Sequence, residues 1–187
     1  MTQNRVQIVI LCEDRQQEVF AVHFLKIRGF NTKNVRVNKS LEGRGSGEQH
    51  VRQHYAAEIK AHRRKNYRSG MIVVMIDADT ATVEETLKEL DNALIEDSQE
   101  LRQPNEAIAI FVPRRNIETW IHYLRTGEIV EEEGQNSRYP KFPKNESACK
   151  PYVEQLVNQC YQGLDYKAPP SLQAACGELQ RILPFLR

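Results

Sequence analysis

The sequence has few aromatic residues and no long hydrophobic run. Of its 187 residues, 7% are aromatic and one is a tryptophan. No stretch approaches the roughly 20 apolar residues of a membrane-spanning helix. The apolar run within MTQNRVQIVILCEDRQ, near the N-terminus, soon meets charged residues, unlike the apolar region of a secretion signal. We therefore expect a cytoplasmic protein without membrane contact.

Several motifs of well-defined chemistry are also missing. The chain has no Walker A sequence, no GxSxG and no dinucleotide-binding glycine fingerprint. Its four cysteines, Cys12, Cys149, Cys160 and Cys176, lack CxxC spacing, so we expect reduced thiols and no zinc site. His50 and His54 are spaced for one helix face, but no glutamate lies between them, which argues against a metalloprotease-type site.

The charged residues are unevenly distributed along a chain that is 40% hydrophobic and 27% charged, as in ordinary globular proteins. Residues 26–68 hold 12 Lys and Arg against 3 Asp and Glu, whereas residues 77–106 hold 2 against 10. One interpretation is two solvated helix faces of opposite charge. The other is that the basic part, above all the polar helix expected at 48–66, contacts a nucleic acid backbone and the acidic part holds metal.

Hydrophobic runs alternate with helical patterns along the first two thirds of the chain. Strands are expected at 6–12, 34–38, 71–76 and 106–112, and helices at 15–28, 48–66, 82–97 and 116–124. This order predicts an α/β fold: a mostly parallel sheet of about four strands with helices on both faces. A polar, acidic segment at 127–145, interpreted as a loop or lid, precedes helices at 150–162 and 170–185. We therefore expect an α/β core at 1–126 and a helical extension at 127–187 packed on it.

Acidic and basic side chains follow three of the predicted strands. These are Glu13, then Asp77 and Asp79, and then Arg114, Arg115 and Glu118. Carboxyl ends of parallel strands share one edge of a sheet, where ligands bind. Asp77 and Asp79 point the same way if strand geometry persists. Clustered carboxylates repel unless a cation lies among them, and Mg²⁺ or Mn²⁺ suits oxygen ligands. The alternative is that one aspartate caps the following helix.

These positions resemble the TOPRIM domain, which also has a Glu after its first strand and a DxD after a later one. Glu13 in VILCEDRQQEVF and Asp77 and Asp79 in VVMIDADT are the matching residues. The stretch FVPRRNIETWIHYL, with Lys150-Pro151 after it, is similar to small bacterial OLD-like TOPRIM proteins that carry an Ile-Glu-x-Trp signature. The first resemblance covers about residues 5–112, and the second extends it to about residue 151.

The resemblance implies a TOPRIM fold and metal-dependent cleavage of DNA or RNA. Asp77 and Asp79 would bind Mg²⁺, Glu13 would be a ligand or general base, and Glu118 a further ligand or positioning acid. Arg15, Arg114 and Arg115 would contact the phosphate, and Lys150 would stabilise the transition state. The family also implies a separate ATPase partner, as in phage-defence or toxin-like systems. A homo-oligomer stays open.

Two departures from the TOPRIM pattern keep a second interpretation open. Asp14 stands where a glycine is usual, and Gln17 stands where OLD-like nucleases often have a second acid. A non-catalytic module that binds metal or nucleic acid within a larger complex is therefore the alternative. A haloacid-dehalogenase-like phosphatase is disfavoured, because its nucleophilic Asp ends the first strand, where this chain has Glu13. Trp120 is interpreted as a core residue, and Arg114, Arg115 and Lys150 also fit ordinary surface charge.

Overall fold

A four-stranded, all-parallel sheet organises the chain. The computed structural model describes residues 7–41, 45–65, 70–131 and 144–186. The strands are β1 (Gln7–Cys12), β2 (Val35–Lys39), β3 (Gly70–Met75) and β4 (Ile108–Phe111), arranged in the order β2-β1-β3-β4. The predicted α/β, Rossmann-like fold with a C-terminal helical region is confirmed, and each strand lies within two residues of its expected limits.

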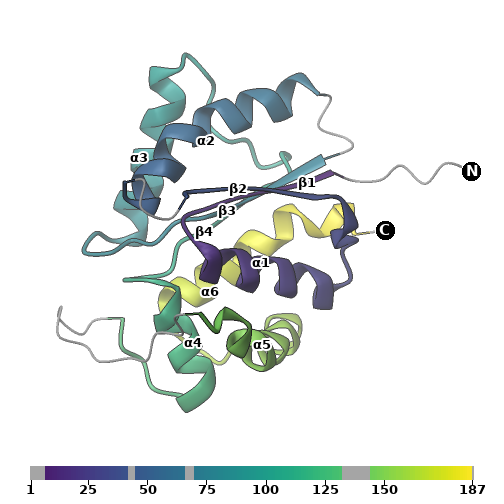
Figure 1. Ribbon diagram of the computed structural model, residues 1–187, viewed down its shortest axis with the longest axis vertical. Coiled ribbons are helices and arrows are strands. Elements are labelled where there is room, and N and C mark those ends of the chain that lie inside the picture. Colours follow the sequence, from purple (N-terminus) through teal and green to yellow (C-terminus); the bar gives the residue numbers. More distant parts are fainter. Residues whose placement is uncertain (1–6, 42–44, 66–69, 132–143, 187) are drawn as a thin grey trace, which may run out of the picture.

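Helices cover both faces of this sheet (Figure 1). They are α1 (Arg15–Arg28), α2 (Gly47–Arg64), α3 (Val83–Glu96), α4 (Ile117–Thr126), α5 (Lys150–Gln162) and α6 (Pro170–Glu178). In Figure 1, α2 and α3 lie on one side of the sheet, and α1, α4, α5 and α6 lie on the other. None of the helices in the described residues is long and apolar enough to cross a membrane.

Alternate residues of each strand enter two separate hydrophobic clusters. Ile8 and Ile10 of β1 pack with α1, α4, α5 and α6, whereas Val9 and Leu11 pack with α2 and α3. All four side chains are at least nine-tenths buried. The unbroken apolar runs of the sequence therefore reflect strands that are covered on both faces, as parallel sheets require.

Local signals in the sequence set the helix limits. Gly29 ends α1 with a φ of 103°, a left-handed conformation that favours glycine, and its N–H bonds the carbonyls of the last turn. Thr82 begins α3 with a capping box: its side chain accepts from the N–H of Glu85, whose carboxylate accepts from the N–H of Thr82. These signals explain why the limits of α1 and α3 could be predicted closely. The helix expected at 170–185 instead ends at Glu178, and 3-10 turns follow at Leu179–Arg181 and Leu183–Phe185.

The C-terminal helices pack on the α/β core through shared hydrophobic side chains. Trp120 is 1% exposed, and its Nε1–H donates to Ser171 Oγ of α6 at 2.7 Å, which confirms its predicted place in the core. The Ser171 hydroxyl in turn donates to Glu131, which is 2% exposed. Glu131 belongs to the segment 127–145 that was predicted to be a loop or lid. The described residues of this segment form no helix or strand, Glu131 itself is buried, and residues 132–143 lie outside the described part.

An ion pair covers the free edge of β4. The carbonyls of Ala107 and Phe111 accept hydrogen bonds from β3, so those of the alternate residues face outward. Arg102 donates to the carbonyl of Ile108 at 3.0 Å, and Glu178 of α6 accepts from the N–H of Ile110 at 2.9 Å. Arg102 and Glu178 also pair with each other. Polar backbone groups at a sheet edge are thereby satisfied without a further strand.

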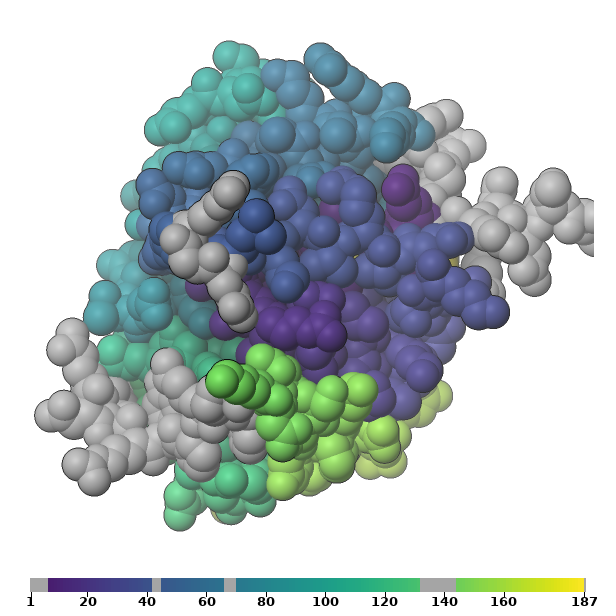
Figure 2. Space-filling model, in the orientation of Figure 1, coloured from purple at the N-terminus to yellow at the C-terminus, as the bar shows by residue number. Residues whose placement is uncertain are grey.

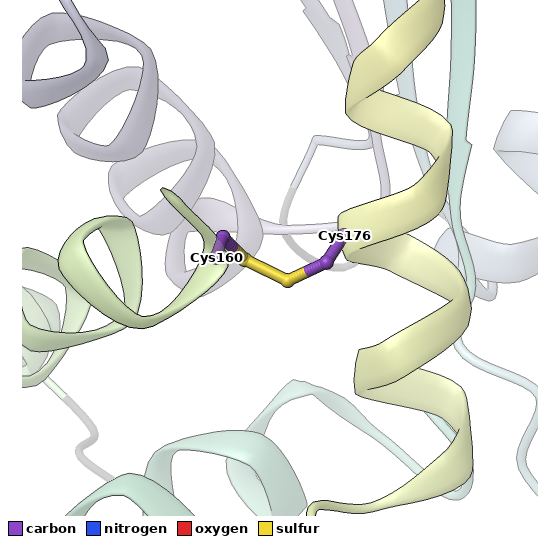
Figure 3. The surroundings of a disulfide bond; sticks show 2 residues. All are labelled: Cys160 and Cys176. Atoms are coloured by element: carbon purple, nitrogen blue, oxygen red, sulfur yellow. A yellow bond between two sulfur atoms is a disulfide. The ribbon is translucent and has the colours of Figure 1, made fainter. Parts of the chain in front are cut away.

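A disulfide bond joins α5 to α6, contrary to the expectation of four reduced thiols. Cys160 and Cys176 are bonded, with their Cα atoms 5.7 Å apart, which is within the usual range (Figure 3). The other two cysteines, Cys12 and Cys149, are free and buried. The expectation failed because it judged the cysteines by their spacing in the sequence. The packing of two helices decides which thiols meet.

Candidate functional site

The first and third strands end beside each other at the point where the chain reverses its direction of winding. From β1 the chain moves outward to β2, and it then crosses back over β1 to β3. A crevice forms at the carboxyl end of such a pair, and ligands bind there in open α/β sheets. Glu13 follows β1 and Asp77 follows β3. Glu13 Oε1 accepts a hydrogen bond from the backbone N–H of Asp77 at 2.6 Å.

Gln17, in the first turn of α1, holds these two acids in place. Its Nε2 donates to Asp77 Oδ1 at 2.9 Å, and its Oε1 accepts from the N–H of Glu13 at 2.9 Å. The side chain is 0% exposed. Asp14 caps α1 by accepting from the N–H of Gln17, which fixes where the helix begins. Sequence reasoning missed this role because it treated Gln17 only as a missing acid. Its position four residues after Glu13, in the first turn of the following helix, was the available signal.

Gly47, the first residue of α2, brings a second helix against Glu13. A Cβ atom at Gly47 would lie 2.6 Å from the Cβ of Glu13 and 3.0 Å from its carbonyl oxygen. Real Cβ atoms do not come so close, so only glycine fits without a shift of the backbone. One glycine of the LEGRGSG segment is therefore required by the close approach of α2 to the acid pair.

The surroundings of Glu13 and Asp77 disfavour the charged forms of both acids. Burial, with the charges of Asp79, Asp14 and Glu48, raises the pKa of Glu13 to about 8, although its hydrogen bond from the N–H of Asp77 acts in the opposite direction. Burial and the charges of Glu13, Glu118 and Asp14 raise the pKa of Asp77 well above its usual range, against the hydrogen bond from Gln17. Both acids therefore hold their protons more tightly than usual, and a cation beside them would favour their charged forms.

Asp79 and Glu118 lie around this pair in different settings. The expectation that Asp77 and Asp79 point the same way assumed that strand geometry persists, but Asp79 has a left-handed φ of 48°. Asp79 is exposed, whereas Asp77 is 7% exposed. The N–H of Asp79 donates to the carbonyl of Arg115 at 2.8 Å, which ties the end of β3 to the loop after β4. Glu118 is half-buried in the first turn of α4.

The donor chemistry of the site suits a hard divalent cation. Within residues 7–41, 45–65, 70–131 and 144–186, no three His, Cys, Asp or Glu side chains are grouped closely enough to hold a metal ion. Mg²⁺, however, commonly takes one or two protein carboxylates and completes its shell with water and substrate phosphate. Glu13 and Asp77 each use one carboxylate oxygen in the hydrogen bonds above, and the second oxygen of each fits this role. The residues present therefore fit Mg²⁺ or Mn²⁺.

The arginines predicted to contact phosphate are bound to backbone carbonyls. Arg114 donates to the carbonyl of Ala81, and Arg115 Nε donates to the carbonyl of Glu131 at 3.3 Å. Arg115 itself has a left-handed φ of 70°. These contacts hold the loop after β4 in place. Sequence spacing could not reveal them, because they depend on turns rather than on regular elements.

Arg15 and Lys150 lie at the starts of two helices. Arg15 is exposed and pairs with Glu18 one turn further along α1. Lys150 is exposed at the first residue of α5. The turn before α5 is tied to α1, because Gln16 Nε2 donates to the carbonyl of Glu146 at 3.2 Å. Figure 2 shows the purple atoms of the α1 region between the blue atoms of the α2 region and the green atoms of the α5 region.

The oppositely charged segments of the sequence meet in the fold. Arg52 of α2 pairs with Glu89 of α3, Lys60 pairs with Asp97, and Arg63 pairs with Glu106. The positive charges of Arg52, Lys60 and Arg63 are therefore paired within the protein, and a nucleic acid is not needed to explain their presence on the helix. For Arg64 and Lys65, at the end of the helix, contact with a nucleic acid stays a prediction.

No family model, no curated protein and no solved structure matches this chain. The resemblance to TOPRIM proteins therefore stays a prediction carried by Glu13, Asp77 and Asp79. The geometry at the ends of β1 and β3 is the basis on which a function can be proposed.

Proposed function

We propose that this chain binds Mg²⁺ or Mn²⁺ at the carboxyl edge of its sheet and cleaves phosphodiester bonds of nucleic acid. The observation that carries the proposal is the direct contact of Glu13 with Asp77 at the reversal point of the sheet, where burial raises the pKa of both acids and the charge of Glu13 raises the pKa of Asp77 further. Acids that need a nearby cation, in the crevice where parallel sheets bind ligands, favour a metal-dependent site.

Each acid has a role in this proposal. Asp77 would hold the cation together with either Asp79 or Glu13, and Glu13, where it is not a ligand, would be the base that takes a proton from the attacking water. Glu118 would position water. When bound, the cation would polarise the scissile phosphate and stabilise the leaving oxygen. Gln17 keeps Asp77 fixed, and Arg15, Arg114, Arg115 and Lys150 would contact the substrate from the segments that border the site.

Cleavage of plasmid, single-stranded DNA and total tRNA, with Mg²⁺ or Mn²⁺ and with EDTA, tests the proposal. We expect metal-dependent cleavage by the wild type and none by Asp77→Asn. Glu96→Gln is the matched control, because Glu96 is exposed at the last residue of α3, the end of that helix opposite to the one that follows Asp79. Equal cleavage by wild type and Asp77→Asn would overturn the proposal, since a contaminating nuclease would then account for the activity.

One observation favours a binding module as the second candidate function. Arg114 and Arg115 are bound to carbonyls of their own chain, and Gln17 adds no charge for a second cation. A module of this kind would bind Mn²⁺ in calorimetry and cleave none of the three substrates. Its ATPase partner, its homo-oligomeric state and its cytoplasmic location are further predictions from the sequence, and co-purification with an ATPase would support the first of them.

A further inference from the structure

Two tyrosines near the end of α5 project into solvent. Tyr161 is 74% exposed and Tyr166 is 82% exposed, the two highest values among the large hydrophobic side chains in the described residues. A cation lies over each ring. The guanidinium carbon of Arg28 is 5.2 Å from the ring centroid of Tyr161, and Lys167 Nζ is 5.5 Å from that of Tyr166. Such contacts are favourable even at exposed sites.

The backbone that carries these rings is held by several contacts. Cys160, directly before Tyr161, is bonded to Cys176 of α6 (Figure 3). After α5, the N–H of Lys167 donates to Asp165 Oδ1 at 2.9 Å. Gln173 Nε2 donates to the carbonyls of Tyr166 and Ala168, at 3.2 and 2.7 Å. The tyrosines are thus exposed on a fixed frame, which lowers the entropy lost when a ligand binds.

The charges around the rings favour an anionic ligand. Arg28 and Lys167 supply positive charge over the rings, and Asp165, the acid between the tyrosines in the sequence, accepts from the N–H of Lys167. Ile27, at 41% exposure, is the neighbouring apolar side chain on α1. A stable protein interface needs about 800 Å² on each partner with an apolar centre. Aromatic rings beside cations are instead the arrangement that stacks unpaired bases and pairs with their phosphates.

We propose that Tyr161 and Tyr166, with Arg28 and Lys167, form a stacking platform for a single strand of nucleic acid. This rests on the proposed function only for the choice of nucleic acid among anionic ligands. The platform binds the strand without metal and without sequence preference. The substrate that reaches the acid pair is therefore a strand with unpaired bases.

The length of α1 sets how long a strand must be to reach both places. Arg15 begins α1 beside the acid pair and Arg28 ends it beside Tyr161. At about 1.5 Å per residue the helix spans roughly 20 Å. A stacked strand advances about 3.4 Å per nucleotide, so about six nucleotides span the same distance. Strands clearly shorter than this cannot occupy the platform and the acid pair together.

Fluorescence anisotropy in EDTA, with a labelled single-stranded dT12 and a 12-base-pair duplex, tests the platform. We expect tighter binding of the single strand and about tenfold weaker binding for each of Tyr161→Ala and Tyr166→Ala, because a stacked base contributes about 1–3 kcal/mol. Tyr161→Phe and Tyr166→Phe keep the rings and should bind within twofold of wild type. Ile95→Ala, exposed on α3, is the control. Unchanged binding in the double alanine variant would overturn the inference, as would equal affinity for the duplex.

The same measurements separate this inference from the proposed function. Binding is read in EDTA and can be repeated in the Asp77→Asn background, so it does not require cleavage. Tyrosine-dependent binding without metal-dependent cleavage would leave the platform standing and refute the nuclease. Cleavage of dT12 that is unaffected by the double alanine variant would support the nuclease and refute the platform.

Discussion

The replacement of Glu13 by glutamine should make the protein more stable at alkaline pH, although Glu13 lies at the centre of the proposed site. Glu13 Oε1 accepts from the N–H of Asp77. A glutamine Oε1 can accept the same bond, so Glu13→Gln removes the charge and keeps the contact. Burial and neighbouring acids raise the pKa of Glu13 from 4.5 to about 8 in the folded state. The folded protein therefore binds this proton more tightly than the unfolded chain does.

The direction of the pH dependence follows from this difference. Below about pH 4.5 Glu13 is protonated in both states, and its contribution to stability is fully present. As the pH rises towards 8, the unfolded state loses the proton first, so the free energy of unfolding falls. A pKa change from 4.5 to about 8 sets a ceiling of about 5 kcal/mol. Because Glu13 is partly exposed, water and relaxation lower this value, and we expect about 2–3 kcal/mol.

Urea unfolding of the wild type and of Glu13→Gln at pH 5, 6.5 and 8, in EDTA, measures this effect. The two proteins should be nearly equal at pH 5, and the variant should be more stable at pH 8. Glu96→Gln serves as the control, because it removes one exposed carboxylate at the end of α3 opposite to the proposed site. A variant that is less stable than wild type at pH 8 would refute the reasoning, since Glu13 would then be held by a favourable partner.

Three further outcomes are expected. At pH 8, 5 mM Mg²⁺ should raise the melting temperature of the wild type but not that of Asp77→Asn, as differential scanning fluorimetry would show; equal rises would place the ion elsewhere. Gln17→Met should lower the free energy of unfolding by about 2–4 kcal/mol, because it leaves the Glu13 N–H and Asp77 Oδ1 without their partner. Gln53→Met, at an exposed position of α2, should change the free energy of unfolding little. Reduction of Cys160–Cys176, 16 residues apart, should cost about 3 kcal/mol, and a thiol titration of the oxidised, unfolded chain should count two thiols rather than four.

The sheet could be predicted from the sequence because its signals are local and strong. VQIVILC and MIVVMI are unbroken apolar runs bounded by polar residues, which is typical of strands covered on both faces. Parallel strands then bring their carboxyl ends to one edge, so the meeting of Glu13 and Asp77 followed from the order of elements. The position of these two acids at one edge of the sheet could therefore be predicted without knowing how the helices pack.

The contacts that complete the site depend on packing between distant segments. Gln17 meets Asp77 across 60 residues, and this requires the orientation of α1 on the sheet. Arg115 reaches the carbonyl of Glu131 from a left-handed conformation that no periodic pattern signals. Likewise, the pairing of Arg63 with Glu106 depends on how the C-terminal end of α2 lies against the segment before β4. Composition indicated the opposite charges but not that they neutralise each other.

The ion pair at the edge of β4 has a consequence for how this protein behaves at high concentration. Arg102 binds the carbonyl of Ile108, and Glu178 binds the N–H of Ile110. These are backbone groups of β4 through which another β-strand would join the sheet. Because Glu178 is the last residue of α6, a chain cut before it would keep all four strands but lose this protection. Such a fragment would expose a ready template for strand addition. In this protein the end of α6 therefore hinders the addition of a strand from another molecule at the β4 edge of the sheet.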